Sequence, residues 1–170
     1  MTIGAISCNA EPSKNTIAQN NNLTCIASTH TNKNDPTKGS HSFIKIKDKN
    51  RIILEKEIPL PDNDFFQNRS YHCIPSRGFF YVLDQVDTHS QQNTNQTLLY
   101  IVKLSKKGNV LLRKYISPPN SDNKIISSWA DKNAEAFNLI NNEFIIKGKW
   151  IDKNNLDSNI QELSTSIHRF

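Results

Sequence analysis

The chain has 170 residues, of which 36% are hydrophobic and 22 are asparagine, and it carries a formal net charge of +5. No apolar run approaches the roughly 20 residues that a membrane-spanning helix needs, and the scarcity of Ala, Leu and Glu argues against a helical bundle. The length is typical of one domain, so we expect a single β domain over residues 1–170. The basic excess favours an acidic partner, whereas lysines scattered along the chain argue against nucleic acid.

The first sixty residues predict three strands, at 22–29, 42–47 and 51–58, with residues 3–8 as a candidate for a fourth. The second and third of these strands form a hairpin signal, because two apolar runs flank a short polar turn. A long polar stretch separates the first strand from this hairpin.

Residues 61–119 repeat this pattern in its clearest form. Segment 102–112 aligns without a gap with segment 44–54, which lies 58 positions earlier. A second pattern of apolar run, polar turn and apolar run precedes it. We expect four strands in this unit, at 70–75, 79–87, 97–104 and 109–116.

Residues 120–170 form the third and least complete unit. The apolar runs predict strands at 135–140, 143–151 and 163–170, without a fourth strand. We expect at most a short helix at 124–131, and another at 62–68 in the preceding unit.

The stretch from Phe79 to Ile116, with its turn Lys106-Lys107-Gly108-Asn109, resembles the blades of NHL-type β-propellers. This resemblance implies a mainly β chain: an antiparallel meander of about ten strands in two and a half to three four-stranded, propeller-like units. Three blades are fewer than the usual minimum of four. The sheets therefore close differently, or two copies pair as a homodimer, or residues 3–8 supply the missing strand. A sandwich or a small barrel is the alternative fold.

Strand direction alternates in a meander, so the long connections between the predicted strands all fall at one end of the molecule. Long loops on a rigid scaffold are where function usually lies. We therefore predict the partner-binding residues at this end, and the alternative is that the aromatic residues among them are buried plugs. The predicted residues are Asp62, Asp64, Phe65, Phe66, His89 and Trp129.

The sequence contains no recognisable catalytic, metal-binding or cofactor-binding motif. HExxH, EF-hand, GxSxG, GxGxxG and Walker patterns are all missing from it. His30 and His89 occupy equivalent positions in the repeat, but the ordinary role of such a histidine is to bond loop backbone at the end of a strand. We therefore expect a protein that is not an enzyme and that uses no metal and no cofactor.

The three cysteines, Cys8, Cys25 and Cys73, include no CxxC pair, which excludes a zinc ribbon and a thioredoxin-type motif. Residues 3–8 are similar to the end of an export signal or a lipobox, which favours the bacterial periplasm, with the cytoplasm as the alternative. In an exported chain we expect a disulfide between Cys8 and Cys25, which lie on neighbouring predicted strands, and a buried, free Cys73. In a reducing compartment all three are small apolar residues.

A small, basic β meander rich in Asn, Lys and Ile is similar in style to bacterial immunity proteins, which neutralise toxins of type VI secretion. That resemblance implies an inhibitor that blocks the active cleft of an acidic effector toxin. Amide-rich loops and two tryptophans suit a carbohydrate- or surface-binding module, which is the alternative. A hydrolase is the third hypothesis.

Overall fold

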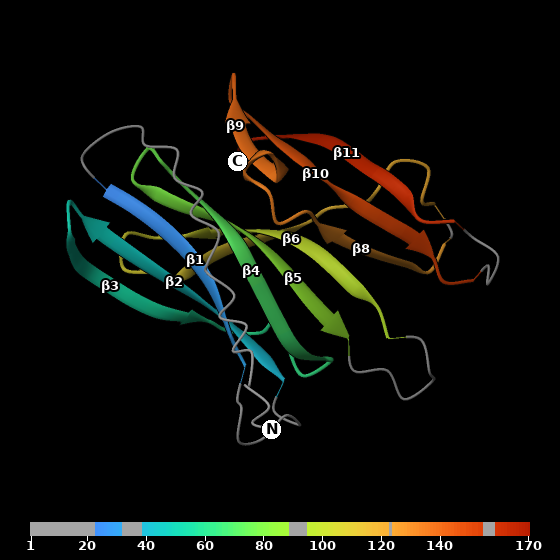
Figure 1. Ribbon diagram of the computed structural model, residues 1–170, viewed down its shortest axis with the longest axis horizontal. Coiled ribbons are helices and arrows are strands. Elements are labelled where there is room, and N and C mark those ends of the chain that lie inside the picture. Colours follow the sequence, from blue (N-terminus) through green and yellow to red (C-terminus); the bar gives the residue numbers. More distant parts are fainter. Residues whose placement is uncertain (1–22, 32–38, 89–94, 123, 155–158) are drawn as a thin grey trace, which may run out of the picture.

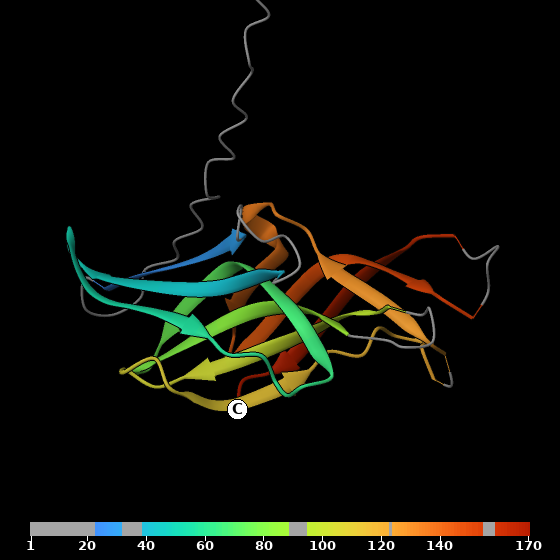
Figure 2. The same ribbon diagram turned by 90° about the horizontal axis from the view of Figure 1, so that it is seen from below.

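The computed structural model describes residues 23–31, 39–88, 95–122, 124–154 and 159–170. These residues form three antiparallel sheets, which follow one another in chain order across the molecule (Figure 1). The view from below also shows the first sheet on the left, the third on the right and the central sheet between them (Figure 2). No helix among the described residues is long and apolar enough to cross a membrane.

The first sheet has three strands in sequence order, and the central sheet has four. The strands of the first sheet are β1 (Leu23–Thr31), β2 (Ser40–Asp48) and β3 (Arg51–Ile58). Those of the central sheet are β4 (Phe65–Ser76), β5 (Phe79–Thr88), β6 (Thr97–Leu104) and β7 (Val110–Tyr115). These strands confirm the strands predicted from the sequence. The prediction succeeds because each tight hairpin joins two apolar runs through a short turn that contains a residue with positive φ, such as Lys49, Gly78 or Gly108.

The third sheet differs from the prediction at its first strand. Its elements are β8 (Ile126–Ala130), a 3-10 turn η2 (Ala134–Ala136), β9 (Phe137–Ile140), β10 (Glu143–Asp152) and β11 (Gln161–His168). Both β8 and β9 pair with the same edge of β10, so they form one strand that η2 interrupts. The expected short helix at 124–131 is therefore wrong, because this segment gives its backbone hydrogen bonds to β10.

Gly148 is the reason that β8 can lie so close to β10. A Cβ atom at this position would lie 2.1 Å from the backbone oxygen of Trp129 and 2.8 Å from the Cα atom of Ala130. Only glycine leaves room for that approach. One residue of β10 therefore determines where the end of β8 lies.

Two apolar layers hold the three sheets together, one on each face of the central sheet. The layer toward the first sheet includes Phe80 and Val82, and the layer toward the third sheet includes Tyr81 and Leu83. This alternation along β5 follows the two-residue period of a strand, and residues 80–87 are all buried. The structure is thus a row of open sheets of three or four strands, which confirms the mainly β, propeller-like class, and none of the described strands closes a barrel.

Candidate ligand-binding site

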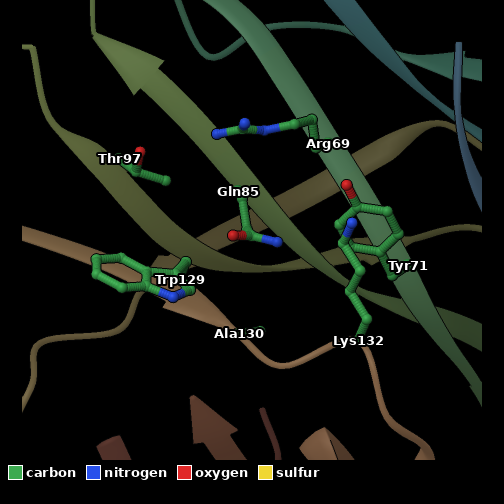
Figure 3. A pocket seen from close by; sticks show the side chains of 7 residues that line it. All are labelled: Arg69, Tyr71, Gln85, Thr97, Trp129, Ala130 and Lys132. Carbon is green, nitrogen blue, oxygen red and sulfur yellow. The ribbon is translucent and has the colours of Figure 1, made fainter. Parts of the chain in front are cut away.

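A pocket of about 320 Å³ lies between the central sheet and β8. Its lining combines two cations, two large aromatic rings, an amide and a hydroxyl group (Figure 3). The lining residues are Arg69, Tyr71, Gln85, Thr97, Trp129, Ala130 and Lys132. Small-molecule sites typically measure about 300–1,000 Å³, so this pocket has the size of a site for a small ligand.

Strand pairing brings the polar side of the pocket together. Arg69 and Tyr71 are two residues apart on β4, which places them on the same face of the sheet. Arg69 is the cross-strand partner of Gln85 on β5, and Asp87 is the partner of Thr97 on β6. Arg69, Gln85 and Thr97 therefore come from three neighbouring strands and lie within two residue positions of one another along the sheet.

The guanidinium group of Arg69 is held by the buried carboxylate of Asp87. Its Nη2 atom donates to Oδ1 at 2.7 Å and to Oδ2 at 2.8 Å. The same carboxylate accepts hydrogen bonds from the Thr97 hydroxyl at 2.7 Å and from the Gln67 amide. Among the described residues all hydrogen bonds of Arg69 come from Nη2, and its buried Nε has no partner. Asp87 thus fixes the arginine but leaves part of its hydrogen-bonding capacity unused.

A second cation and two aromatic rings complete the lining of the pocket. The Lys132 ammonium lies 5.0 Å from the centre of the Tyr71 ring, a cation–π contact. Figure 3 shows Tyr71 and Trp129 on opposite sides of the Gln85 side chain. No carboxylate of the described residues lies within ion-pair distance of Lys132. With Asp87 balancing Arg69, the pocket keeps one positive charge in excess.

Gln85 is the most unusual member of the site. The residue is only 6% exposed, and no side-chain hydrogen bond joins its amide to another described residue. Its amide atoms lie in the middle of the pocket (Figure 3). The amide is not one of the fully buried groups that lack a partner, which among the described residues belong to Arg69, Ser128 and Asn142. It lines the pocket and is open to water or to a ligand there.

Hydrogen bonds between the central and third sheets fix the walls of the pocket. The backbone N–H of Thr97 donates to the Ser127 hydroxyl at 2.9 Å, and the Gln96 amide donates to the carbonyl of Ile126 at 2.8 Å. On β4, His72 Nε2 lies 2.7 Å from the backbone oxygen of Asp131. A carbonyl only accepts, so Nε2 carries the proton of that bond. Burial lowers the pKa of His72 below its usual value, against the opposing effect of this hydrogen bond.

A second polar cluster lies on the other face of the central sheet, around the fully buried Asp84. Its carboxylate accepts from Ser70 at 2.6 Å, from Ser42 at 2.9 Å and from Asn68 at 3.2 Å, and it lies 3.5 Å from Arg113. Burial raises the pKa of Asp84, and these hydrogen bonds and the arginine act in the opposite direction. Each group has its partner inside the protein, so this cluster joins the first sheet to the central sheet and is not a ligand site.

Of the predicted partner-binding residues, only Trp129 lines the pocket, and it does so from strand β8 rather than from a loop. Asp62 and Asp64 are exposed between β3 and β4, where the Asp64 N–H donates to an Asp62 carboxylate oxygen at 2.8 Å. Phe65 and Phe66 begin β4 and are half-buried, and the Phe65 ring packs edge-on against Tyr100 at 6.4 Å. His89 lies outside the described residues. The six residues therefore do not form one site in the part of the chain that the structure describes.

The disulfide prediction needs a correction. Cys25 on β1 is bonded to Cys73 on β4, with their Cα atoms 5.5 Å apart. Cys73 is therefore not free, and Cys25 has no thiol left for Cys8, which lies outside the described residues. The physical reason is that β1 packs against β4 across the first apolar layer, which also contains both sulfur atoms.

Most of the pocket was missed by sequence reasoning, although a signal exists. Polar residues interrupt the long β4 strand in the run 67–71, and Asp84 and Gln85 interrupt the apolar β5 strand. A strand that is buried on both faces is ordinarily an unbroken apolar run. Polar residues that pair with one another across two such strands indicate a ligand site or a buried polar network. Here Arg69 and Gln85 line the pocket, and Ser70 and Asp84 belong to the buried network.

Comparisons with known proteins assign no family to this chain. No family model matches the chain, and no curated protein matches it. Among solved structures it is similar to a subtype N10 neuraminidase-like protein of A/little yellow-shouldered bat/Guatemala/060/2010, with 18% sequence identity and a TM-score of 0.39. The match covers 84% of this chain and 40% of that protein. No group of three or more metal-ligating side chains occurs in the described part of the chain.

Proposed function

We propose that this protein is a non-enzymatic binding protein that holds an anionic group of its ligand in the pocket between the central sheet and β8. The observation that carries the proposal is the excess of positive charge there: Lys132 has no carboxylate partner among the described residues, and Arg69 keeps donors that Asp87 does not use. Cations beside low-dielectric walls attract an anion more strongly than they would in open water.

The remaining lining favours binding over bond cleavage. Gln85 and Thr97 offer hydrogen bonds, and Tyr71 and Trp129 offer flat apolar surfaces. The aliphatic hydroxyl of the lining, that of Thr97, already donates to Asp87, which itself accepts from three neighbours. Neither group is therefore placed as an activated nucleophile or as a general base.

A panel of small anions tests this proposal: carboxylates, inorganic phosphate and sulfate, titrated against the full chain by ligand-observed NMR. At least one class should bind the wild-type protein, and Lys132→Glu should weaken that binding at least tenfold. Lys124→Glu is the matched control, because Lys124 likewise lies over an aromatic ring, 5.1 Å from the centre of the Trp150 ring, but outside the pocket. If no anion binds, or if both variants lose binding equally, the proposal is wrong.

A second candidate is an exported inhibitor of an acidic bacterial toxin, which would place an acidic side chain in the same pocket. The Cys25–Cys73 disulfide supports it, since such bonds persist in oxidising compartments such as the periplasm, and so does the net charge of +5. Pull-down from the native organism followed by mass spectrometry tests it. A toxin should be captured by the wild-type protein and lost with Lys132→Glu, and capture of no toxin would contradict it.

A further inference from the structure

The proposed anion site does not explain two features of the pocket, its aromatic walls and its unpaired amide. Cations and N–H donors bind a bare phosphate or sulfate ion. Such an ion makes no favourable contact with the ring faces of Tyr71 and Trp129 or with the acceptor oxygen of Gln85. The ligand therefore has a second chemical character besides its charge.

Gln85 indicates what that second character is. A side-chain amide both donates and accepts hydrogen bonds, and the Gln85 amide lines the pocket without a side-chain partner among the described residues. Its best partner is a group that also donates and accepts, and a hydroxyl is the simplest such group. The Thr97 hydroxyl, which donates to Asp87, still has lone pairs to accept from a second ligand hydroxyl.

The rings indicate the shape of the ligand. In Figure 3 the Tyr71 and Trp129 side chains lie on either side of the Gln85 amide, and all three line the pocket that a ligand bonded to this amide would occupy. Aromatic faces are electron-rich and attract the weakly positive C–H groups of a saturated ring. A sugar has such a ring and carries hydroxyl groups on it.

Resting on the proposed anion site, we propose that the ligand is a carboxylated sugar, namely a hexuronic acid, alone or at the end of a glycan. Its carboxylate lies by Lys132 and Arg69, which binds carboxylates in a planar, forked geometry. Its hydroxyls bond Gln85 and Thr97, and its ring packs against Tyr71 and Trp129. The volume of about 320 Å³ suits a ligand of one or two rings.

Four probes separate this ligand class from the others in one NMR titration of the full chain. They are D-glucuronate, D-glucose, benzoate and inorganic phosphate. Glucuronate should bind at least tenfold more tightly than each of the others, because glucose lacks the charge, benzoate lacks the hydroxyls and phosphate lacks the ring.

Two variants complete the test, with folding checked by circular dichroism. Gln85→Met keeps the volume but removes the amide, and it should weaken glucuronate binding at least tenfold while leaving phosphate binding within about twofold. Should Gln85→Met not fold, Trp129→Leu takes its place with the same expectation. Equal binding of glucuronate and phosphate or benzoate, or full affinity in the variant, would overturn the sugar class and leave the anion site standing. Binding of no probe would overturn both.

Discussion

His72 is a buried histidine whose protonation opposes folding. Because burial lowers its pKa in the folded protein, the unfolded chain takes up a proton first as the pH falls below about 6.5. We predict that the free energy of unfolding decreases from pH 7 to pH 5, and that His72→Gln, which keeps a donor for the Asp131 carbonyl, flattens this decrease. Urea unfolding at several pH values measures it, with the exposed His168→Gln as control. Parallel curves for wild type and His72→Gln would refute the prediction.

Asp84 is the buried charge on which the contact between the first and central sheets depends. Its removal leaves the mostly buried Arg113 without a counter-charge and leaves two serine hydroxyls without their acceptor. We predict that Asp84→Ala lowers the free energy of unfolding by about 3–5 kcal/mol. The exposed Asp62→Ala should change it by less than about 0.5 kcal/mol. Denaturant titration compares the two, and similar values would show that the Asp84 network contributes little.

At this scale, Trp129 is the one residue of the predicted binding set that lines the pocket among the described residues, and the sequence did not predict its neighbours there. The partners of Trp129 come from β4, β5 and β6, between about 30 and 60 positions away in the chain. Only the register of three strands and the packing of β8 on them bring these side chains together. Their polarity was visible in the sequence, but their meeting point was not.

Among the elements, β5, β6 and β7 of the central sheet were predicted to within one residue at each end, because their hairpins are local. The strand β4 begins five residues before the predicted 70–75, where a short helix at 62–68 was expected. The expected strands 79–87 and 97–104 compare with β5 and β6 as Phe79–Thr88 and Thr97–Leu104. In contrast, β8 is five residues long, carries two serines and pairs with residues about 20 positions further on. Its strand character comes from that distant partner, so no local pattern predicts it.

Gly148 offers a direct test of how β8 is held. We predict that Gly148→Ala lowers the free energy of unfolding by about 1–3 kcal/mol, because the methyl group of the new alanine would overlap the Trp129 carbonyl. The same change should displace the end of β8 and weaken binding in the pocket. Lys147→Ala, exposed on the same strand, is the control for both measurements. Unchanged stability and unchanged binding in Gly148→Ala would show that β8 is not positioned by this approach.

For the whole molecule, the Cys25–Cys73 disulfide is a covalent cross-link between the first sheet and the central sheet. It closes a loop between positions 48 residues apart, and the chain-entropy model gives about 4 kcal/mol for such a loop. We predict that replacing Cys25 and Cys73 together by Ala lowers the free energy of unfolding by about 2–4 kcal/mol. Thermal and urea unfolding with and without reductant check this. A reductant that leaves the wild-type stability unchanged would contradict it.

The burial of β5 on both faces also determines the order in which the protein opens. Amide protons on this strand become accessible to solvent only when the flanking strands β4 and β6 separate from it, and that separation disturbs both apolar layers at once. Local fluctuations of either outer sheet leave these protons covered. In deuterated water the β5 amides should therefore exchange last, with protection approaching that of global unfolding.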